Sequence, residues 1–228
     1  MLGRHRCYRL TPRCWDTLTE EWWQWAYSLP YTAHPLFYTA DASAGQHGKV
    51  WFLGGNFTGA ADTRTAVIPR GKFLFFPILN TMMDDTDCSG SGRTVDPYTV
   101  AQLRALLTPS MDGAHAMSCT IDGVPVPGLS DAAHSHFRVH TPSPQGFSYA
   151  IPGQDSLNVL FGYPCWSDKN GAPIRVEAKK YHAVGDGYYL MVAPLAPGAH
   201  TIHIQGTTAT GYTQDETYNL TVLAHDGD

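Results

Sequence analysis

The first strongly periodic segment of the chain has the spacing of an amphipathic helix. Thr17 and Glu20 form a T-x-x-E capping box, which marks a helix start, and Pro30 marks its end. The apolar side chains that fall on one face at helical spacing are Leu18, Trp22, Trp25, Ala26 and Leu29. A tryptophan-rich stripe of this kind usually packs a helix onto a sheet, so we interpret it as structural rather than as a ligand platform.

From Lys49 onward the pattern changes to short runs of β-branched and aromatic residues separated by Gly and Pro. The runs that predict strands are 49–57, 63–68, 72–80, 117–121, 124–126, 136–139, 147–151, 187–195, 200–205 and 216–223. The pair Asp122-Gly123 between two of these runs is the strongest short signal for a hairpin. Residues 73–79 are almost continuously apolar, which suits a strand covered on both faces.

A second helix is predicted after residue 96. Asp96 can cap it, and Pro97 suits its first position. Its apolar face comprises Val100, Leu103, Leu106 and Leu107. Together the patterns predict an all-β fold. We expect a single β-sandwich, either jelly-roll or immunoglobulin-like, with two short peripheral helices over residues 16–228.

Composition narrows the class of protein. Of 228 residues only 15% are charged, and Gly (22) and Pro (16) are frequent, which excludes a coiled coil, a helix bundle and a charged disordered chain. The net charge is -5 and there is no basic stripe, so nucleic acid is not an expected partner. No run of about 18 apolar residues occurs, so no transmembrane helix is expected.

Residues 1–15 are basic, and we interpret them as a disordered leader. Four arginines fall there: Arg4, Arg6, Arg9 and Arg13. The segment lacks the apolar stretch of about 7–15 residues that a signal peptide needs. Export, if it occurs, therefore needs a signal outside this sequence or another route.

One acidic loop has the spacing of a calcium site. Asp85, Asp87, Ser89 and Asp96 follow the D-x-D-x-S-G-x5-acid pattern, which aims hard oxygen ligands at one centre. Asp84 adds negative charge beside it. The last position is Asp rather than Glu, and Arg93 also departs from the pattern. A solvated acidic turn, with Asp96 acting as a helix cap, is the alternative interpretation.

Histidines suggest a different metal chemistry. His134 and His136 would share a strand face, with His140 nearby and His182 and His200 further along the chain. Three or four of these imidazoles, if gathered, would suit a cupin-like oxidase or a zinc hydrolase. The spacing alone does not gather them, and surface histidines are the alternative.

Aromatic residues offer a third kind of site. Exposed Trp and Tyr rings on a β-sandwich can stack on sugar rings, and the main candidates are Trp51, Trp166 and Tyr188. Most aromatic residues in such a fold belong to the core. Several acids could supply a glycosidase pair, but their spacing selects no two of them: Asp62, Asp84, Glu177, Asp186 and Asp215.

Several stretches resemble a family of uncharacterised bacterial proteins, most of them predicted to be secreted. The matching stretches are 22–30 (WWQWAYSLP), 45–53 (GQHGKVWFL), 63–77 (TRTAVIPRGKFLFFP) and 186–195 (DGYYLMVAPL), followed by His200-Thr-Ile-His203. The likeness runs from about Trp22 to Leu223. It implies a secreted or periplasmic location and transfers no catalytic residue, because the family has no established activity.

The five cysteines leave the disulfide pattern open. They are Cys7, Cys14, Cys88, Cys119 and Cys165, and no C-x-x-C motif is present. The resemblance implies a Cys88–Cys165 bridge. From the residues alone a Cys88–Cys119 bridge is equally compatible, and reduced, buried thiols are the third alternative.

These observations predict an extracellular or cell-envelope binding module. Its ligand would be a glycan, and calcium would be a structural ion. The alternatives are a metal-dependent enzyme that uses the histidines and a structural or assembly protein without a pocket.

Overall fold

The computed structural model describes residues 12–36, 42–84, 98–130, 136–141, 146–150, 152, 157, 175–176 and 183–225. Its helices are α1 (Pro12–Ser28), the 3-10 turn η1 (Tyr31–Ala33) and α2 (Val100–Asp112). Its strands are β1 (Val50–Phe52), β2 (Asp62–Ile68), β3 (Phe73–Asp84), β4 (His115–Ile121), β5 (Val124–Pro125), β6 (Arg138–His140), β7 (Tyr149–Ala150), β8 (Arg175–Val176), β9 (Ala183–Val192), β10 (Gly198–Thr207) and β11 (Thr213–Val222).

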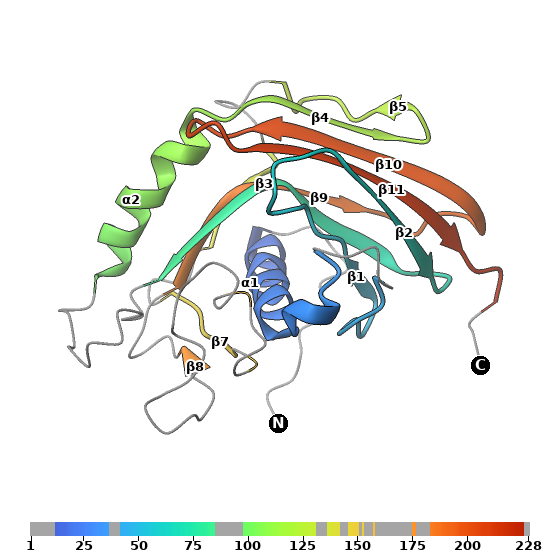
Figure 1. Ribbon diagram of the computed structural model, residues 1–228, viewed down its shortest axis with the longest axis horizontal. Helices are drawn as coiled ribbons and strands as arrows, with labels where there is room; N and C mark the ends of the chain where they lie inside the picture. Colours follow the sequence, from blue (N-terminus) through green and yellow to red (C-terminus); the bar gives the residue numbers. More distant parts are fainter. Residues whose placement is uncertain are drawn as a thin grey trace.

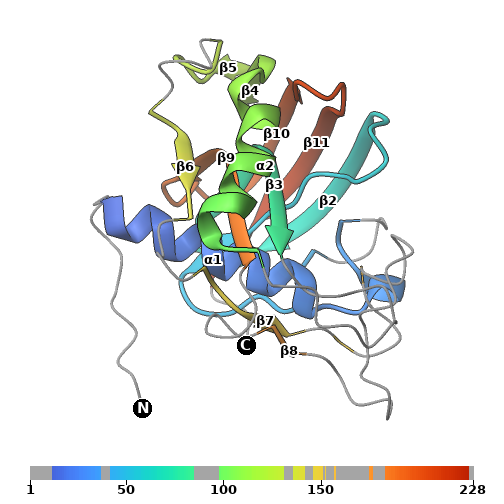
Figure 2. The same cartoon turned by 90° about the vertical axis from the view of Figure 1, so that its left-hand side faces the viewer.

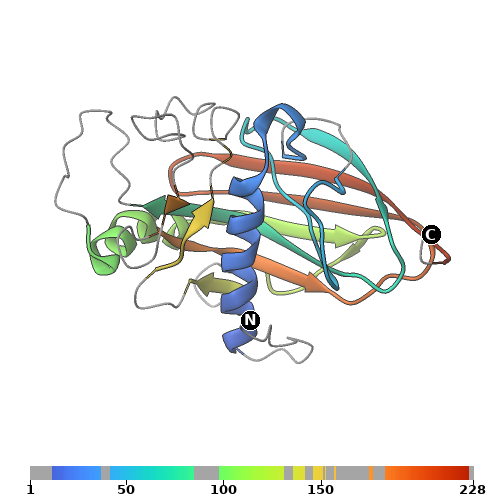
Figure 3. The ribbon, with the colours of Figure 1, turned by 90° about the horizontal axis from the view of Figure 1, so that it is seen from below.

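Two sheets and one helix form three layers (Figure 1). The central sheet has the strand order β1-β3-β9-β6, and the outer sheet has the order β2-β11-β10-β4-β5. Helix α1 lies across the free face of the central sheet (Figure 3), and α2 packs at one end against β3 and β9 (Figure 2). The main hydrophobic core lies between the sheets and the second lies between α1 and the central sheet.

Strand β3 contributes side chains to both cores, because successive side chains of a strand point to opposite faces of the sheet. Leu74 and Phe76 belong to the core between the sheets, and Phe75 belongs to the α1 core. A β-bulge falls between Pro77 and Leu79. An extra residue in one strand shifts the alternation, so the residues after the bulge resume the pattern one position later. The apolar run 73–79 was predicted to be covered on both faces, and this is confirmed.

The β-rich architecture with two helices is confirmed. The finer assignment to a jelly-roll or an immunoglobulin-like sandwich stays a prediction. Both of those topologies use antiparallel sheets, whereas β1 pairs with β3 in parallel and β2 pairs with β11 in parallel. These two parallel pairs bring distant parts of the chain together, which local patterns do not predict.

Both helices begin at other residues than the sequence predicted. Helix α1 begins at Pro12, within the segment interpreted as a leader, because proline suits the first helical position. Helix α2 begins at Val100 rather than at Pro97. Thr99 is its N-cap and forms a capping box with Gln102. In the described ranges, no helix is both long and apolar enough to cross a membrane.

A buried arginine joins the outer sheet to two loops. Arg64 on β2 is 2% exposed, and its Nε lies 2.9 Å from Oε1 of the fully buried Glu216 on β11. Its Nη1 donates to the carbonyls of Pro35 (2.8 Å) and Gly55 (3.0 Å), and its Nη2 donates to Leu36 O (2.7 Å). Because a buried charge is tolerated only when it is paired and hydrogen-bonded, Arg64 fixes both loops against the sheet.

The Arg64 network predicts a large stability loss when only one partner is removed. We expect Arg64→Met to lower the free energy of unfolding by about 3 kcal/mol or more, because it leaves Glu216 buried without its cation. The double variant Arg64→Met/Glu216→Leu should lose less than the single variant, since no buried charge remains. Urea denaturation measures both against Thr65→Ala, an exposed neighbour on β2. A single variant no less stable than Thr65→Ala would contradict this role.

Candidate functional site

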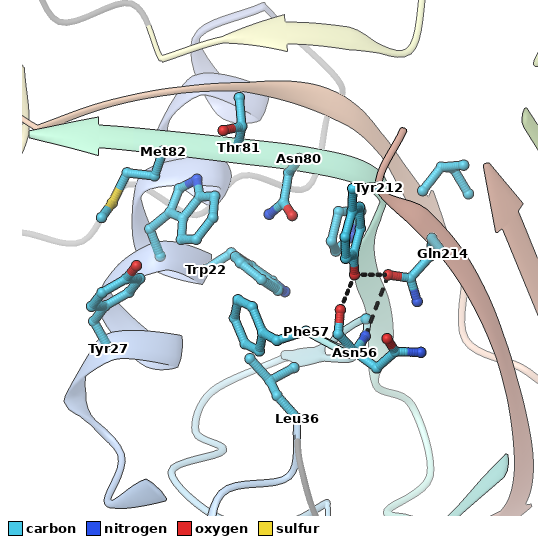
Figure 4. A pocket seen from close by; sticks show the side chains of 14 residues that line it. Trp22, Tyr27, Leu36, Asn56, Phe57, Asn80, Thr81, Met82, Tyr212 and Gln214 are labelled. Atoms are coloured by element: carbon cyan, nitrogen blue, oxygen red, sulfur yellow. Dashed lines mark hydrogen bonds between the residues drawn. The ribbon is translucent and has the colours of Figure 1, made fainter. Parts of the chain in front are cut away.

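A pocket of about 240 Å³ lies between α1 and the part of β3 that follows the bulge. Helix α1 contributes Trp22, Trp23 and Tyr27, and β3 contributes residues 77–78 and 80–82. The remaining wall comes from Leu36, from residues 55–57 and from the start of β11 with the residue before it (Figure 4). The pocket is thus built where segments that are distant in the sequence meet.

Aromatic rings form much of the wall, and each is fixed by its own contacts. Trp22 is 2% exposed, and its indole Nε1 donates to Leu53 O at 2.8 Å. Its ring packs edge-on against Trp23, with centroids 4.9 Å apart. The close-up view shows Phe57 next to Trp22 and Tyr212 across from it (Figure 4). Such rings offer apolar area with little conformational freedom left to lose.

The polar groups of the pocket are uncharged. Asn80 points from β3 into the space between Trp22 and Tyr212 (Figure 4), and its Nδ2 donates to the Tyr189 hydroxyl at 3.3 Å. Within the described part of the chain, nothing bonds to its Oδ1. Burial raises the pKa of Tyr212 to about 12, so its phenol stays neutral at physiological pH.

Hydrogen bonds fix the orientation of the Gln214 amide beside Tyr212. Its Oε1 accepts from the backbone N–H of Asn56 (3.3 Å) and from the Tyr212 hydroxyl (3.2 Å). A backbone N–H can only donate, so the atom facing it is the oxygen. The buried Nε2 of Gln214 then has no hydrogen-bond partner among the described residues.

Among the described residues, no charged side chain lines this pocket. An ion that entered it would lose hydration without gaining a counter-charge. The pocket therefore suits a neutral group that combines apolar surface with a few hydrogen-bonding atoms.

The aromatic residues singled out from the sequence lie elsewhere. Trp51 is 5% exposed and Tyr188 is fully buried, and both pack in the core between the sheets. In this arrangement neither ring presents a face to solvent. Trp166 lies outside the described residues, so its assignment to a ligand site stays a prediction.

The proposed calcium ligands Asp85, Asp87, Ser89 and Asp96 all lie outside the described residues. The nearest described residue is Asp84 at the end of β3, whose Oδ2 accepts a 2.5 Å hydrogen bond from the Tyr149 hydroxyl. The calcium site stays a prediction.

The described histidines of the metal-enzyme hypothesis are dispersed. The His136 ring lies tilted against that of Phe137, with centroids 4.0 Å apart, while His200 contacts Asp122 at 2.7 Å. His140 lies beside Asp186, and His134 and His182 fall outside the described residues. Over the described ranges, no three His, Cys, Asp or Glu side chains are grouped as a metal ion would require.

His140 nevertheless contacts a buried carboxylate, that of Asp186. Its Nδ1 lies 3.2 Å from Oδ1 of Asp186, which is fully buried, while the His140 side chain is 49% exposed. Arg138 holds the same carboxylate with two contacts, Nε to Oδ1 at 3.1 Å and Nη2 to Oδ2 at 2.7 Å. Burial alone would raise the pKa of Asp186, but the bonds from His140 and Arg138 lower it below its usual value. A buried carboxylate that orients an exposed imidazole is an arrangement used in acid–base catalysis.

A second carboxyl with a shifted pKa lies near this cluster. Burial raises the pKa of Glu20 on α1 to about 7, and the charges of Asp16 and Glu21 add to the shift. Arg104 on α2 opposes the shift, and it also interacts with Asp186 while donating to Thr141 O. The pKa of Glu20 thus lies near neutral pH, and the charge of Arg104 acts on its carboxyl group.

The only cysteine whose side chain the structure describes is Cys119, a free thiol in the core between the sheets. Burial raises its pKa to about 12, so it is neither ionised nor reactive at neutral pH. A Cys88–Cys119 bridge is therefore not formed. The Cys88–Cys165 pairing involves residues outside the described ranges and stays a prediction.

Sequence reasoning missed most of the pocket. Two signals could have indicated it. Asn80 is a polar residue that follows an apolar run, and the pair Gly54-Gly55 follows one residue after the end of β1. A Cβ on Gly54 would come 1.5 Å from Leu36 Cδ2, and one on Gly55 would come 2.2 Å from Gln214 Oε1. These glycines are required by the close approach of the loop to the pocket wall.

Comparisons with protein-family models, with curated proteins and with solved structures find no match to this chain. The resemblance to secreted bacterial proteins accordingly stays a prediction. The assignment of function rests on the geometry of the sites.

The shifted pKa of Glu20 predicts a pH-dependent stability. In the unfolded chain this carboxyl ionises with its ordinary pKa of 4.5, whereas burial in the folded protein raises the pKa to about 7. The free energy of unfolding should therefore fall as the pH rises from 4.5 to 7, by roughly 1–2 kcal/mol for this partly exposed group.

Glu20→Gln should remove that part of the pH dependence. The measurement is urea denaturation of both proteins at several pH values between 4 and 8. An identical slope in wild type and variant would show that Glu20 ionises normally in the folded protein.

Proposed function

We propose that this protein is a binding module that holds a neutral group of its ligand in the pocket between α1 and β3. The proposal rests on one observation: the pocket combines aromatic walls with amide and phenol groups, and none of its described lining residues is charged. Binding sites for uncharged small groups have this composition, with apolar walls and few oriented polar atoms. A sugar ring of a glycan is such a group, as the sequence predicted.

The size and the polar atoms of the pocket support this proposal. At about 240 Å³ it lies below the range of about 300–1,000 Å³ typical of sites for drug-sized ligands, so it suits one ring or one side chain. Asn80 Oδ1 can accept a hydrogen bond from the bound group. A secreted or periplasmic location is part of the proposal and rests on the family resemblance.

Isothermal calorimetry with probes that differ in charge tests the proposed function. We expect methyl glucoside or a capped leucine amide to bind, and their charged counterparts, glucuronate and a capped glutamate amide, to bind at least tenfold more weakly. Asn80→Asp should weaken binding of the neutral probe at least tenfold, because it places a charge inside the pocket.

Asn219→Asp on the exposed face of β11 is the matched control and should leave binding unchanged. If neither neutral probe binds, or if the two aspartate variants behave alike, the pocket is not the ligand site.

Calcium as a structural ion is a further part of this proposal and rests on the spacing of Asp85, Asp87, Ser89 and Asp96. We expect millimolar Ca²⁺ to raise the melting temperature, and Asp85→Ala to abolish the rise. An unchanged melting temperature in Ca²⁺ would remove the loop as a calcium site.

The second candidate function is acid–base catalysis, which the contact between His140 and Asp186 favours. In the metal-dependent form predicted from the sequence, the enzyme would carry stoichiometric Cu, Fe, Mn or Zn after purification. Elemental analysis separates this metal-dependent enzyme from the binding module, because the binding module would carry calcium alone.

A further inference from the structure

The pocket borders an open edge of the central sheet. Strand β1 pairs with β3 only from Val50–Phe73 to Phe52–Phe75, and one further bond joins Leu53 N–H to Phe75 O. Strand β3 itself continues to Asp84, paired with β9 on its other side. Within the described part of the chain, no strand lies along the edge of β3 beyond Phe75.

The hydrogen bonds of β9 show which backbone groups of β3 face this edge. Tyr189 N–H donates to Phe137 O, and Gly185 O accepts from Thr141 N–H, so odd-numbered residues of β9 bond toward β6. Opposed residues of an antiparallel pair either bond to each other or both point away. Asn80 opposes Gly187 and Met82 opposes Gly185. Asn80 and Met82 therefore direct their N–H and C=O groups to the open edge.

The lining of the pocket supports the same conclusion. Asn80, Thr81 and Met82 all line it, although successive side chains of a strand point to opposite faces. Figure 4 shows Thr81 pointing away from the cavity in which Asn80 lies. A pocket in contact with all three borders the edge of the strand as well as its α1 face.

Pro77 defines where this open edge begins. Tyr189, which opposes Pro77, directs its N–H to β6, so the nitrogen of Pro77 faces the β1 side. Proline has no N–H to donate, which is tolerated at an edge. The bulge follows directly. The ladder from β1 is thus interrupted, and the next two outward-facing residues are Asn80 and Met82.

We propose that the ligand is an extended peptide that adds a short strand to the edge of β3 and places one neutral side chain in the aromatic pocket. This deepens the proposed function and rests on it, because both use the same pocket. Strand addition draws affinity from main-chain hydrogen bonds and specificity from pockets for alternate side chains. Two edge residues limit the pairing to a short segment of peptide.

Amide hydrogen exchange in the free protein is the first test. The amides of Asn80 and Met82 should exchange quickly, and that of Thr81, which bonds within the β3–β9 ladder, should exchange slowly. If Asn80 and Met82 are protected in the free protein, the edge is already occupied by this chain or by a second copy, and the proposal fails.

The second test uses capped pentapeptides of the form acetyl-Thr-X-Thr-X-Thr-amide. With X as Leu or Phe we expect binding by calorimetry and protection of the Asn80 and Met82 amides. With X as Lys or Glu we expect at least tenfold weaker binding. N-methylation of the peptide bonds should also weaken binding at least tenfold, because it removes the main-chain donors.

Variants at Met82 separate the edge from the side chain. Met82→Pro and Met82→Ala both remove a side chain that lines the pocket, but only Met82→Pro also removes the N–H that β9 does not use. Met82→Pro should therefore weaken peptide binding at least tenfold more than Met82→Ala does, and equal weakening would contradict the strand pairing. If Met82→Pro does not fold, the N-methylated peptides carry the same test. Binding of methyl glucoside without any peptide binding would overturn the peptide inference and leave the proposed function standing. If no neutral probe binds, the peptide inference and the proposed function are both wrong.

Discussion

The buried guanidinium of Arg64 is the constraint on which the pocket depends. It is held by Glu216 on β11 and by Asp62 on its own strand, with Nε at 2.9 Å and 3.1 Å from their carboxylates. Its remaining donors bind carbonyls of the two loops that pass over the edge of the outer sheet. One side chain thus satisfies backbone acceptors that would otherwise be buried without partners, at a position where no regular strand could do so.

The consequence of this constraint is that two irregular segments become rigid walls. Leu36 is placed by the bond from Arg64 to its own carbonyl, and Asn56 is tied to Glu216 through its Nδ2 at 3.3 Å. The Tyr218 hydroxyl accepts a hydrogen bond from Gly54 N–H (3.1 Å) and donates one to Gly54 O (2.9 Å). The loop that follows β1 is therefore turned away from β3, and this departure leaves the edge of β3 open beside the pocket.

Local features of the fold follow from the sequence because they depend on neighbouring residues. The Asp122-Gly123 hairpin forms with positive φ at both residues (51° and 76°), as its turn type requires. The apolar run before Asn80 becomes the strand that serves both cores. Helix starts were less well predicted, since Thr17 and Asp96 are capping residues that α1 and α2 do not use.

The candidate site could not be predicted in the same way. The pairing of Arg64 with Glu216 and that of His140 with Asp186 join residues far apart in the chain, and no spacing rule indicates them. Trp51 and Tyr188 were selected as exposed rings, yet both lie in the core, because alternation alone does not tell which face of a strand is covered by a second sheet. Trp22 was assigned to packing, and it both packs and lines the pocket.

The most direct test of the central claim is the response of the indole N–H signals in a heteronuclear NMR titration with a neutral ligand. The account predicts that the signals of Trp22 and Trp23, which line the pocket, shift with saturation, while that of Trp51 in the core between the sheets does not. A shift confined to Trp51, or no shift at either pocket tryptophan while the ligand binds, would contradict it.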